Sequence, residues 1–97
     1  MLKPILLVED NPNDLELTLV ALEKSKLAND VIVIRDGGEA LQYLNATDAY
    51  KDRPSGNPAV ILLDLKLPKV DGLEVLRHVR ESPVLKSTPV VMLTSSK

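Results

Sequence analysis

Four short runs of apolar residues, none of which alternates with polar residues, constrain the fold of this chain more than any other feature. Continuous runs rich in Val, Ile and Leu are typical of strands that are buried on both faces, as in a parallel sheet between helices. The four expected strands cover residues 4–8, 31–34, 59–63 and 89–93.

Helical patterns separate these strands, and polar residues mark where the helices begin. Asn11 is a suitable N-cap before Pro12, Asp71 is a suitable N-cap for a later helix, and a Gly37–Gly38 turn precedes the helix between them. The expected helices cover residues 13–26, 39–44 and the stretch from Asp71 to Pro83. Strand and helix therefore alternate, which is typical of an open α/β sheet. We expect a doubly wound, flavodoxin-like parallel sheet, and we take its strand order to be 2-1-3-4.

The connection over residues 45–58 is longer than the two to six residues that usually join a helix to a strand. It ends in residues that favour turns, from Pro54 to Pro58. We expect an extra helical turn in this connection, followed by an exposed loop.

Composition excludes several classes of protein. The 97 residues suffice for one small domain, 1–97, and contain no Cys, which excludes zinc fingers, disulfide scaffolds and iron–sulfur proteins. The chain has only two aromatic residues, Tyr43 and Tyr50, and a pI near 5.3, which argues against a nucleic-acid partner.

The longest apolar run has five residues, whereas a membrane span needs about 20. Because acidic residues follow the first apolar run, we identify no signal peptide and expect a cytoplasmic protein without a membrane partner.

Polar side chains follow three of the four strands at the point where each apolar run ends. Glu9 and Asp10 follow the first run, Asp64 follows the third, and Thr94 follows the fourth. In strand order 2-1-3-4 the first and third strands are neighbours, so the three carboxylates should converge at the carboxyl edge of the sheet. Crowded carboxylates either retain a proton or bind a cation, and an all-oxygen set suits Mg²⁺. A carboxylate beside this cation and a hydroxyl suits phosphoryl transfer.

From residue 3 to its last residue, the chain resembles a known family, the receiver domain of bacterial two-component response regulators. Four motifs carry the resemblance: Val8-Glu9-Asp10-Asn11, Gly38-Glu39-Ala40-Leu41, Asp64-Leu65-Lys66-Leu67-Pro68 followed by Asp71-Gly72, and Pro89-Val90-Val91-Met92-Leu93-Thr94.

The resemblance implies a signalling domain that accepts a phosphoryl group from a histidine kinase, and not an enzyme that turns over. It implies that Asp64 is the phosphoacceptor and that Thr94 supplies the family's switch hydroxyl. It also implies a Mg²⁺ site formed by Asp64, Asp10, Glu9 through water, and the backbone carbonyl of Lys66. The long stretch over residues 45–58 is similar to single-domain receivers that partner phytochrome-type kinases.

The sequence departs from the family's pattern after the fourth strand. The fifth strand, the last two helices and the lysine that follows the fifth strand have no counterpart, and Lys97 does not occupy the position of that lysine. We therefore expect a C-terminally truncated receiver. One face of its sheet should be covered by the first helix alone and its fourth strand should form an unprotected edge, so we expect a homodimer.

Each candidate residue also has a purely structural interpretation. Glu9 would then be an acid at the entry to a helix, Thr94 a hydroxyl that satisfies backbone groups at a strand end, and Asp71 a helix cap. His78 is expected at the surface without a phosphotransfer role. Lys66, like Lys69, either favours an incoming phosphate or is simply solvated.

Three other functions compete with the phosphoacceptor. A phosphatase of the haloacid-dehalogenase type needs a second acid two residues after the nucleophile, where this chain has Lys66. A truncated receiver could instead serve only in association. A dinucleotide-binding domain is disfavoured because the first strand-to-helix turn, at residues 11–13, contains no G-x-G-x-x-G motif.

Overall fold

The fold is built on a parallel four-stranded sheet, described by a computed structural model for residues 3–53 and 56–93. The strands are β1 (Ile5–Val8), β2 (Val31–Ile34), β3 (Val60–Asp64) and β4 (Val90–Leu93), in the spatial order β2-β1-β3-β4. The expected fold class and strand order are therefore confirmed.

The register of the sheet decides which residues meet at its carboxyl edge. Val8, the last residue of β1, lies opposite Ile34 of β2 and Leu63 of β3. Glu9 and Asp64 are the next residues along two adjacent strands, so both reach the same level of the sheet. Asp64 is itself the last residue of β3, one residue beyond the predicted end of that strand.

Three α-helices and one short 3₁₀ helix connect the strands. The elements are α1 (Pro12–Lys24), α2 (Gly37–Asn45), η1 (Asp48–Tyr50) and α3 (Gly72–Glu81). The side chains of Asn11, Asp36 and Asp71 each accept a hydrogen bond from a backbone N–H in the first turn of the helix that follows. These N-caps set where the helices begin. The predictions for Asn11 and Asp71 are confirmed, and η1 supplies the extra turn expected after α2.

The predicted helix boundaries differ from those of the structure by one or two residues, and two of these differences have a clear cause. The second helix begins at Gly37 and not at residue 39, because the Asp36 cap draws Gly37 and Gly38 into its first turn. The first helix ends at Lys24 and not at residue 26, where Lys26 has a left-handed φ of 56°. In the part of the chain that the structure describes, no helix is long and apolar enough to span a membrane.

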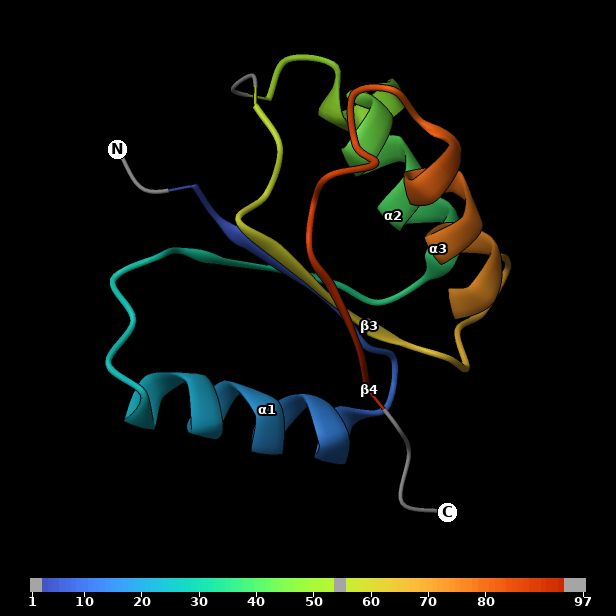
Figure 1. Cartoon of the computed structure of the whole chain (residues 1–97). Helices are drawn as coiled ribbons and strands as arrows, with labels where there is room; N and C mark the ends of the chain where they lie inside the picture. The colour runs from blue at the N-terminus through green and yellow to red at the C-terminus, as the bar shows by residue number, and fades with distance from the viewer. Residues whose placement is uncertain (1–2, 54–55, 94–97) are drawn as a thin grey trace.

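The two faces of the sheet are covered unequally. Figure 1 shows α2 and α3 together on one face, while α1 lies alone across the other. Alternate strand residues form the core beneath α2 and α3, and they are buried together with Ala40, Tyr43 and Leu44 of α2 and Val75 and Val79 of α3. The strand residues of that core are Leu6, Val8, Ile34, Ile61 and Leu63. In contrast, no described residue of α1 is buried.

Large apolar side chains remain exposed around α1. Leu17 of α1 is 69% exposed and Val91 of β4 is 49% exposed. Val33 of β2 is also exposed. Because β2 and β4 are the outer strands of the sheet, α1 covers its centre and leaves both flanks open. The expected incomplete cover of this face is confirmed for the described residues.

The long connection between α2 and β3 folds back onto α2. The Arg53 guanidinium lies over the ring of Tyr43, 4.5 Å from its centroid, and its Nε donates to the Tyr43 carbonyl at 2.6 Å. The Tyr50 ring meets the Tyr43 ring edge-on, with centroids 5.2 Å apart, and the Tyr50 hydroxyl donates to the Glu39 carboxylate. The connection therefore closes the C-terminal end of α2, where the last carbonyl groups lack partners within the helix.

Candidate functional site

Two buried carboxyl groups, from Glu9 and Asp64, lie side by side at the carboxyl edge of the sheet. Glu9 is only 2% exposed and Asp64 only 5% exposed. The Glu9 Oε2 accepts a hydrogen bond from the Asn11 N–H at 3.1 Å. Carboxyl groups are seldom buried this completely unless another group pairs with them or binds them.

The surroundings of Glu9, Asp64 among them, alter the ionisation of Glu9. Burial raises the pKa of Glu9 from its ordinary value of 4.5 to about 7, and the hydrogen bond and the charge of Asp64 add to the rise. The hydrogen bond from the Asn11 N–H opposes it. Without a cation, Glu9 therefore retains a proton well above the usual range of a carboxylic acid. This is one of the two outcomes expected for carboxylates crowded at the strand ends.

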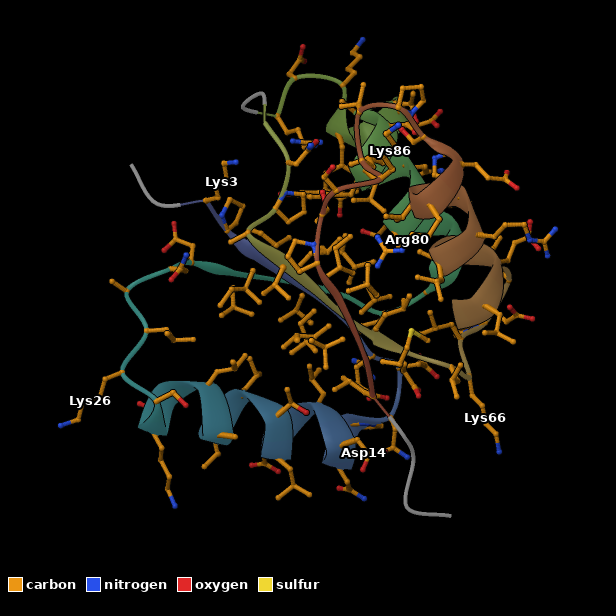
Figure 2. All side chains as sticks on the ribbon, viewed as in Figure 1. Lys3, Asp14, Lys26, Lys66, Arg80 and Lys86 are labelled. Atoms are coloured by element: carbon orange, nitrogen blue, oxygen red, sulfur yellow. The ribbon has the colours of Figure 1, made fainter. Side chains whose placement is uncertain are left out.

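Asp10 contributes an exposed carboxylate beside this buried pair. Asp10, Asp64 and Lys66 line one surface hollow of about 290 Å³, together with Asn11, Pro12 and Asp14. Figure 2 shows Asp14 in the first turn of α1 and Lys66 in the loop after β3. The structure thus brings Asp10, Asp64 and Lys66 together at one surface hollow.

Glu9 does not share that hollow. It lines a second one, of about 330 Å³, between α1 and β4, together with Asp14, Leu17, Thr18, Met92 and Leu93. Within the described ranges no three acidic or imidazole side chains form a group that could hold a metal ion by themselves. The predicted convergence of three carboxylates is therefore incomplete, because Glu9 extends towards β4 while Asp10 extends towards the loop after β3.

Asp14 is a residue of the site that the sequence analysis missed. It lines both hollows, and its charge contributes to the raised pKa of Glu9. Its position four residues after Asp10, in the first turn of a capped helix, places it beside the site and was available as a signal.

The donor atoms of the hollow suit Mg²⁺. They are carboxylate oxygens with no sulfur or imidazole nitrogen, and Mg²⁺ needs only one or two carboxylates because it keeps several waters. The absence of a three-carboxylate group in the described part of the chain is compatible with this mode of binding. The backbone carbonyl of Lys66 remains a predicted ligand.

Two glycines position the segment that follows Asp64. The Gly72 N–H donates to the Leu65 carbonyl at 2.9 Å, and a Cβ on Gly72 would lie 2.1 Å from the Asp64 carbonyl oxygen. The Gly37 N–H donates to the Pro68 carbonyl at 3.2 Å. Both positions need a residue without a side chain, because a Cβ on Gly37 would overlap the Val70 carbonyl oxygen. The glycines of α2 and α3 therefore hold the loop after β3 in place.

The remaining candidate residues have varied environments. Asp71 caps α3 by accepting from the Glu74 N–H at 3.0 Å, which confirms its structural interpretation. His78 is half-buried and not simply a surface residue, because its Nε2 lies 2.9 Å from Asn45 Oδ1 and links α3 to α2. Lys66 and Lys69 are both exposed. Thr94 lies outside the described residues.

Comparison with known proteins identifies the family. The response regulator receiver domain matches residues 5–97 of this chain. The chain belongs to the response regulator receiver family. This receiver domain is 45% identical over 94 residues to response regulator Rcp1 of Synechocystis sp., covering 97% of this chain and 63% of Rcp1.

Solved structures of receivers match the fold closely. The bacteriophytochrome response regulator RtBRR is 72% identical with a TM-score of 0.96, over 99% of this chain and 58% of that one. The phosphorylated cyanobacterial phytochrome response regulator RcpA is 45% identical with a TM-score of 0.88, over 99% of this chain and 67% of that one. Rcp1 has been solved in a Mn²⁺-bound form. The receiver domain described here spans about three-fifths of the length of Rcp1 and RtBRR.

Proposed function

We propose that this receiver domain is a phosphoacceptor of a two-component system, which takes a phosphoryl group from a histidine kinase onto Asp64 with the help of Mg²⁺. The observation that carries the proposal is the placement of Asp64. It ends a central strand and lines a solvent-filled hollow that it shares with Asp10 and Lys66. The phosphorylated state of RcpA and the Mn²⁺-bound form of Rcp1 support the same chemistry here.

The proposed reaction is a displacement at phosphorus. A carboxylate oxygen of Asp64 forms a bond to phosphorus while the bond from phosphorus to the imidazole nitrogen of the kinase breaks. The electron pair of the broken bond returns to that nitrogen, which regains its neutral imidazole form. When bound, Mg²⁺ would neutralise charge on the transferring group, held by Asp10, Asp64, the Lys66 carbonyl and, through water, Glu9.

The chain's own residues prepare Asp64 for this role. Its strand and the Gly72 contact fix the backbone, so the nucleophile needs no rearrangement before attack. The exposed cations of Lys66 and Lys69 offset the negative charge of a phosphodonor approaching the acidic edge. In this proposal Thr94 supplies the switch hydroxyl, and the domain does not turn over as an enzyme. A phosphatase of the haloacid-dehalogenase type is less well supported, because exposed Lys66 stands where that class needs an acid.

We propose a phytochrome-type histidine kinase as the phosphodonor, in the cytoplasm. The 72% identity to a bacteriophytochrome response regulator supports this choice of kinase. The folded connection at η1, which the sequence analysis associated with phytochrome partners, is consistent with it. The choice is tested by comparing phosphotransfer from a phytochrome kinase and from an unrelated histidine kinase.

The phosphoacceptor is tested by treating the chain with acetyl phosphate and Mg²⁺ and measuring its mass. The parent should gain one phosphoryl group, which hydroxylamine removes, and Asp64→Asn should gain none because an amide does not attack phosphorus. Asp52→Asn, which removes an exposed carboxylate from the connection before β3, is the matched control and should label like the parent. Labelling of Asp64→Asn at the parental rate would refute the assignment.

The metal site is tested separately by Mg²⁺ titration. Asp10→Asn should lose most of the Mg²⁺ affinity, because a carboxylate that lines the hollow is replaced by a neutral amide. The same titration of Asp52→Asn provides the control. If Asp10→Asn bound Mg²⁺ as tightly as the parent, Asp10 would not be a ligand.

We propose, second, that this chain forms a homodimer through the sheet face that α1 covers incompletely. Exposed Leu17 and Val91 flank that face, and β4 is an edge strand with no charged residue. Leaving a few hundred Å² of apolar surface in water costs several kcal/mol at about 25 cal/mol per Å². A second copy would bring an identical apolar face and an identical open edge, which can pair about a two-fold axis.

The dimer is tested by light scattering at micromolar concentration. The parent should have the mass of a dimer, and Val91→Lys should be monomeric because its charge lies within the proposed interface. Leu73→Lys is the control, since Leu73 is 60% exposed on α3, across the sheet from α1. A monomeric parent with cooperative thermal unfolding would contradict the proposal.

A further inference from the structure

A single peptide unit in the loop between β1 and α1 is held from both of its polar ends. The Arg35 Nη2 donates to the Asp10 carbonyl oxygen at 3.1 Å. The N–H of the same peptide unit, which belongs to Asn11, donates to Glu9 Oε2 at 3.1 Å. Because the peptide group is planar, these two hydrogen bonds together restrict the orientation of one rigid plane.

Arg35 reaches this peptide unit from the neighbouring strand. It directly follows Ile34, the last residue of β2, and the Ile34 carbonyl accepts a hydrogen bond from the Glu9 N–H at 3.0 Å. Two successive residues at the end of β2, Ile34 and Arg35, thus bond two successive residues after β1, Glu9 and Asp10. The loop that contains Glu9 and Asp10 is therefore fastened to β2 as well as to its own strand.

The arrangement is favourable electrostatically. A guanidinium stands at the carbonyl end of the peptide dipole and a carboxyl group stands at its N–H end, so each group strengthens the hydrogen bond made by the other. Asp10 lies between these two contacts and the hollow that its side chain lines with Asp64. The two hydrogen bonds restrict the backbone from which the Asp10 side chain extends to that hollow.

We propose that Arg35 is a positioning residue for metal binding: it holds the Asp10 carbonyl and so orients the Asp10 carboxylate towards the hollow shared with Asp64. The proposal rests on the Mg²⁺ site proposed above. The positioning contact and the charge of Arg35 should have opposite effects on Mg²⁺ affinity. A cation near a metal site repels Mg²⁺, so the loss of that charge alone would raise the affinity, whereas the loss of the positioning contact would lower it.

The sign of the change in affinity therefore tests the proposal. Arg35→Gln should lower the Mg²⁺ affinity of the full chain by about threefold to tenfold, the effect of one hydrogen bond of ordinary strength. Arg77→Gln is the control, because it also removes one arginine charge but from an exposed pair with Glu74 on α3. The Mg²⁺ affinity of Arg77→Gln should stay within about twofold of the parent, because loss of an exposed ion pair has little effect. An unchanged or raised affinity of Arg35→Gln would overturn the proposal.

A measurement without metal separates this inference from the proposed Mg²⁺ site. In the NMR spectrum of the metal-free chain, the amide resonance of Asn11 should shift in Arg35→Gln and stay in place in Arg77→Gln. If the parent bound no Mg²⁺ but this shift appeared, the metal site would be wrong while the contact through Arg35 would stand. If the Asn11 resonance did not move, Arg35 would not hold the peptide and the inference would fail.

Discussion

The backbone of Gly37 lies so close to Val70 that a Cβ on Gly37 would be 1.6 Å from the Val70 carbonyl oxygen. The neighbouring Gly38 has no such constraint, since its Cβ would meet the Asp36 Oδ1 at 3.3 Å and the Lys69 side chain at 3.7 Å and beyond. Of these two glycines in the first turn of α2, Gly37 alone packs tightly against the loop that follows Asp64.

This contact predicts that two adjacent alanine substitutions differ strongly in their effect on stability. Gly37→Ala should lower the free energy of unfolding by about 2 kcal/mol or more, because backbone must move to relieve the overlap. Gly38→Ala should change it by less than about 1 kcal/mol, since alanine favours the helix while Asp36 must shift slightly. Urea denaturation of both variants checks the difference. Equal stability of the two variants would contradict the close approach.

The pKa of Glu9 predicts how stability depends on pH in the absence of metal. Its folded-state value of about 7 exceeds its ordinary value of 4.5, so the folded chain binds the proton more tightly than the unfolded chain does. The stability from Glu9 is therefore fully present below about pH 4.5 and is lost as the pH rises through 7. Denaturation of Glu9→Gln at several pH values should lack this loss. Glu74→Gln, which replaces an exposed carboxyl group, is the control and should lose stability with rising pH as the parent does.

Protons and Mg²⁺ should compete at the same site. Because Glu9 releases its proton near pH 7, the affinity for Mg²⁺ should rise between pH 6 and pH 8 in the parent. In Glu9→Gln the affinity should be lower and should vary less across this range. Titration calorimetry at the two pH values measures both effects. The same pH dependence in parent and variant would exclude Glu9 as the titrating group.

Tyr50 should ionise only in strongly alkaline solution. Its hydrogen bond to Glu39 is the first cause that raises its pKa to about 12, followed by burial. In Tyr43→Phe, Tyr50 is the sole tyrosine of the sequence, so its phenolate absorbance can be followed directly. The titration should centre near 12 and should move to lower pH when Glu39→Gln is added. The stability that this hydrogen bond provides should be lost as the pH rises from 10 to 12.

Arg53 should stabilise α2 in a manner that lysine does not reproduce. Its planar guanidinium stacks on Tyr43 and donates to the Tyr43 and Leu44 carbonyls at the helix end, at 2.6 Å and 3.4 Å. Arg53→Lys should therefore lower the free energy of unfolding by about 1 to 2 kcal/mol. The exposed Lys51→Arg is a control for exchange of the cation type and should be neutral. An equally stable Arg53→Lys would show that only the charge matters.

Periodicity and strand-end residues were sufficient to predict the sheet and much of the candidate site. Continuous apolar runs predicted parallel strands, and the strand order then placed Glu9 and Asp64 on adjacent strands. The sequence could not predict that Glu9 and Asp10 line different hollows, because this depends on the direction in which each side chain extends from the loop. The interaction of Arg35 with Asp10 was also hidden, since 25 residues separate them and only the register of β1 and β2 brings them together.

The start of α2 shows the same limit. Gly37–Gly38 is a common turn signal, so the sequence favoured a helix beginning later. Tertiary contact decides otherwise, because Gly37 has to approach the loop at Val70 while it is part of the helix. The contacts of Arg53 and Tyr50 were unpredictable for a similar reason, since both are made within a connection that has little regular structure.

The unequal cover of the two sheet faces implies unequal local stability. The buried side chains of α2 and α3 pack with the strands in one core cluster, whereas α1 buries none of its described residues. A form in which α1 has undocked while the sheet, α2 and α3 persist should therefore lie only slightly above the native state in free energy. Because the loop with Glu9 and Asp10 leads directly into α1, each undocking event would disturb the acidic edge while leaving Asp64 in its strand. Asp64 would then belong to a unit of higher local stability than Glu9 and Asp10.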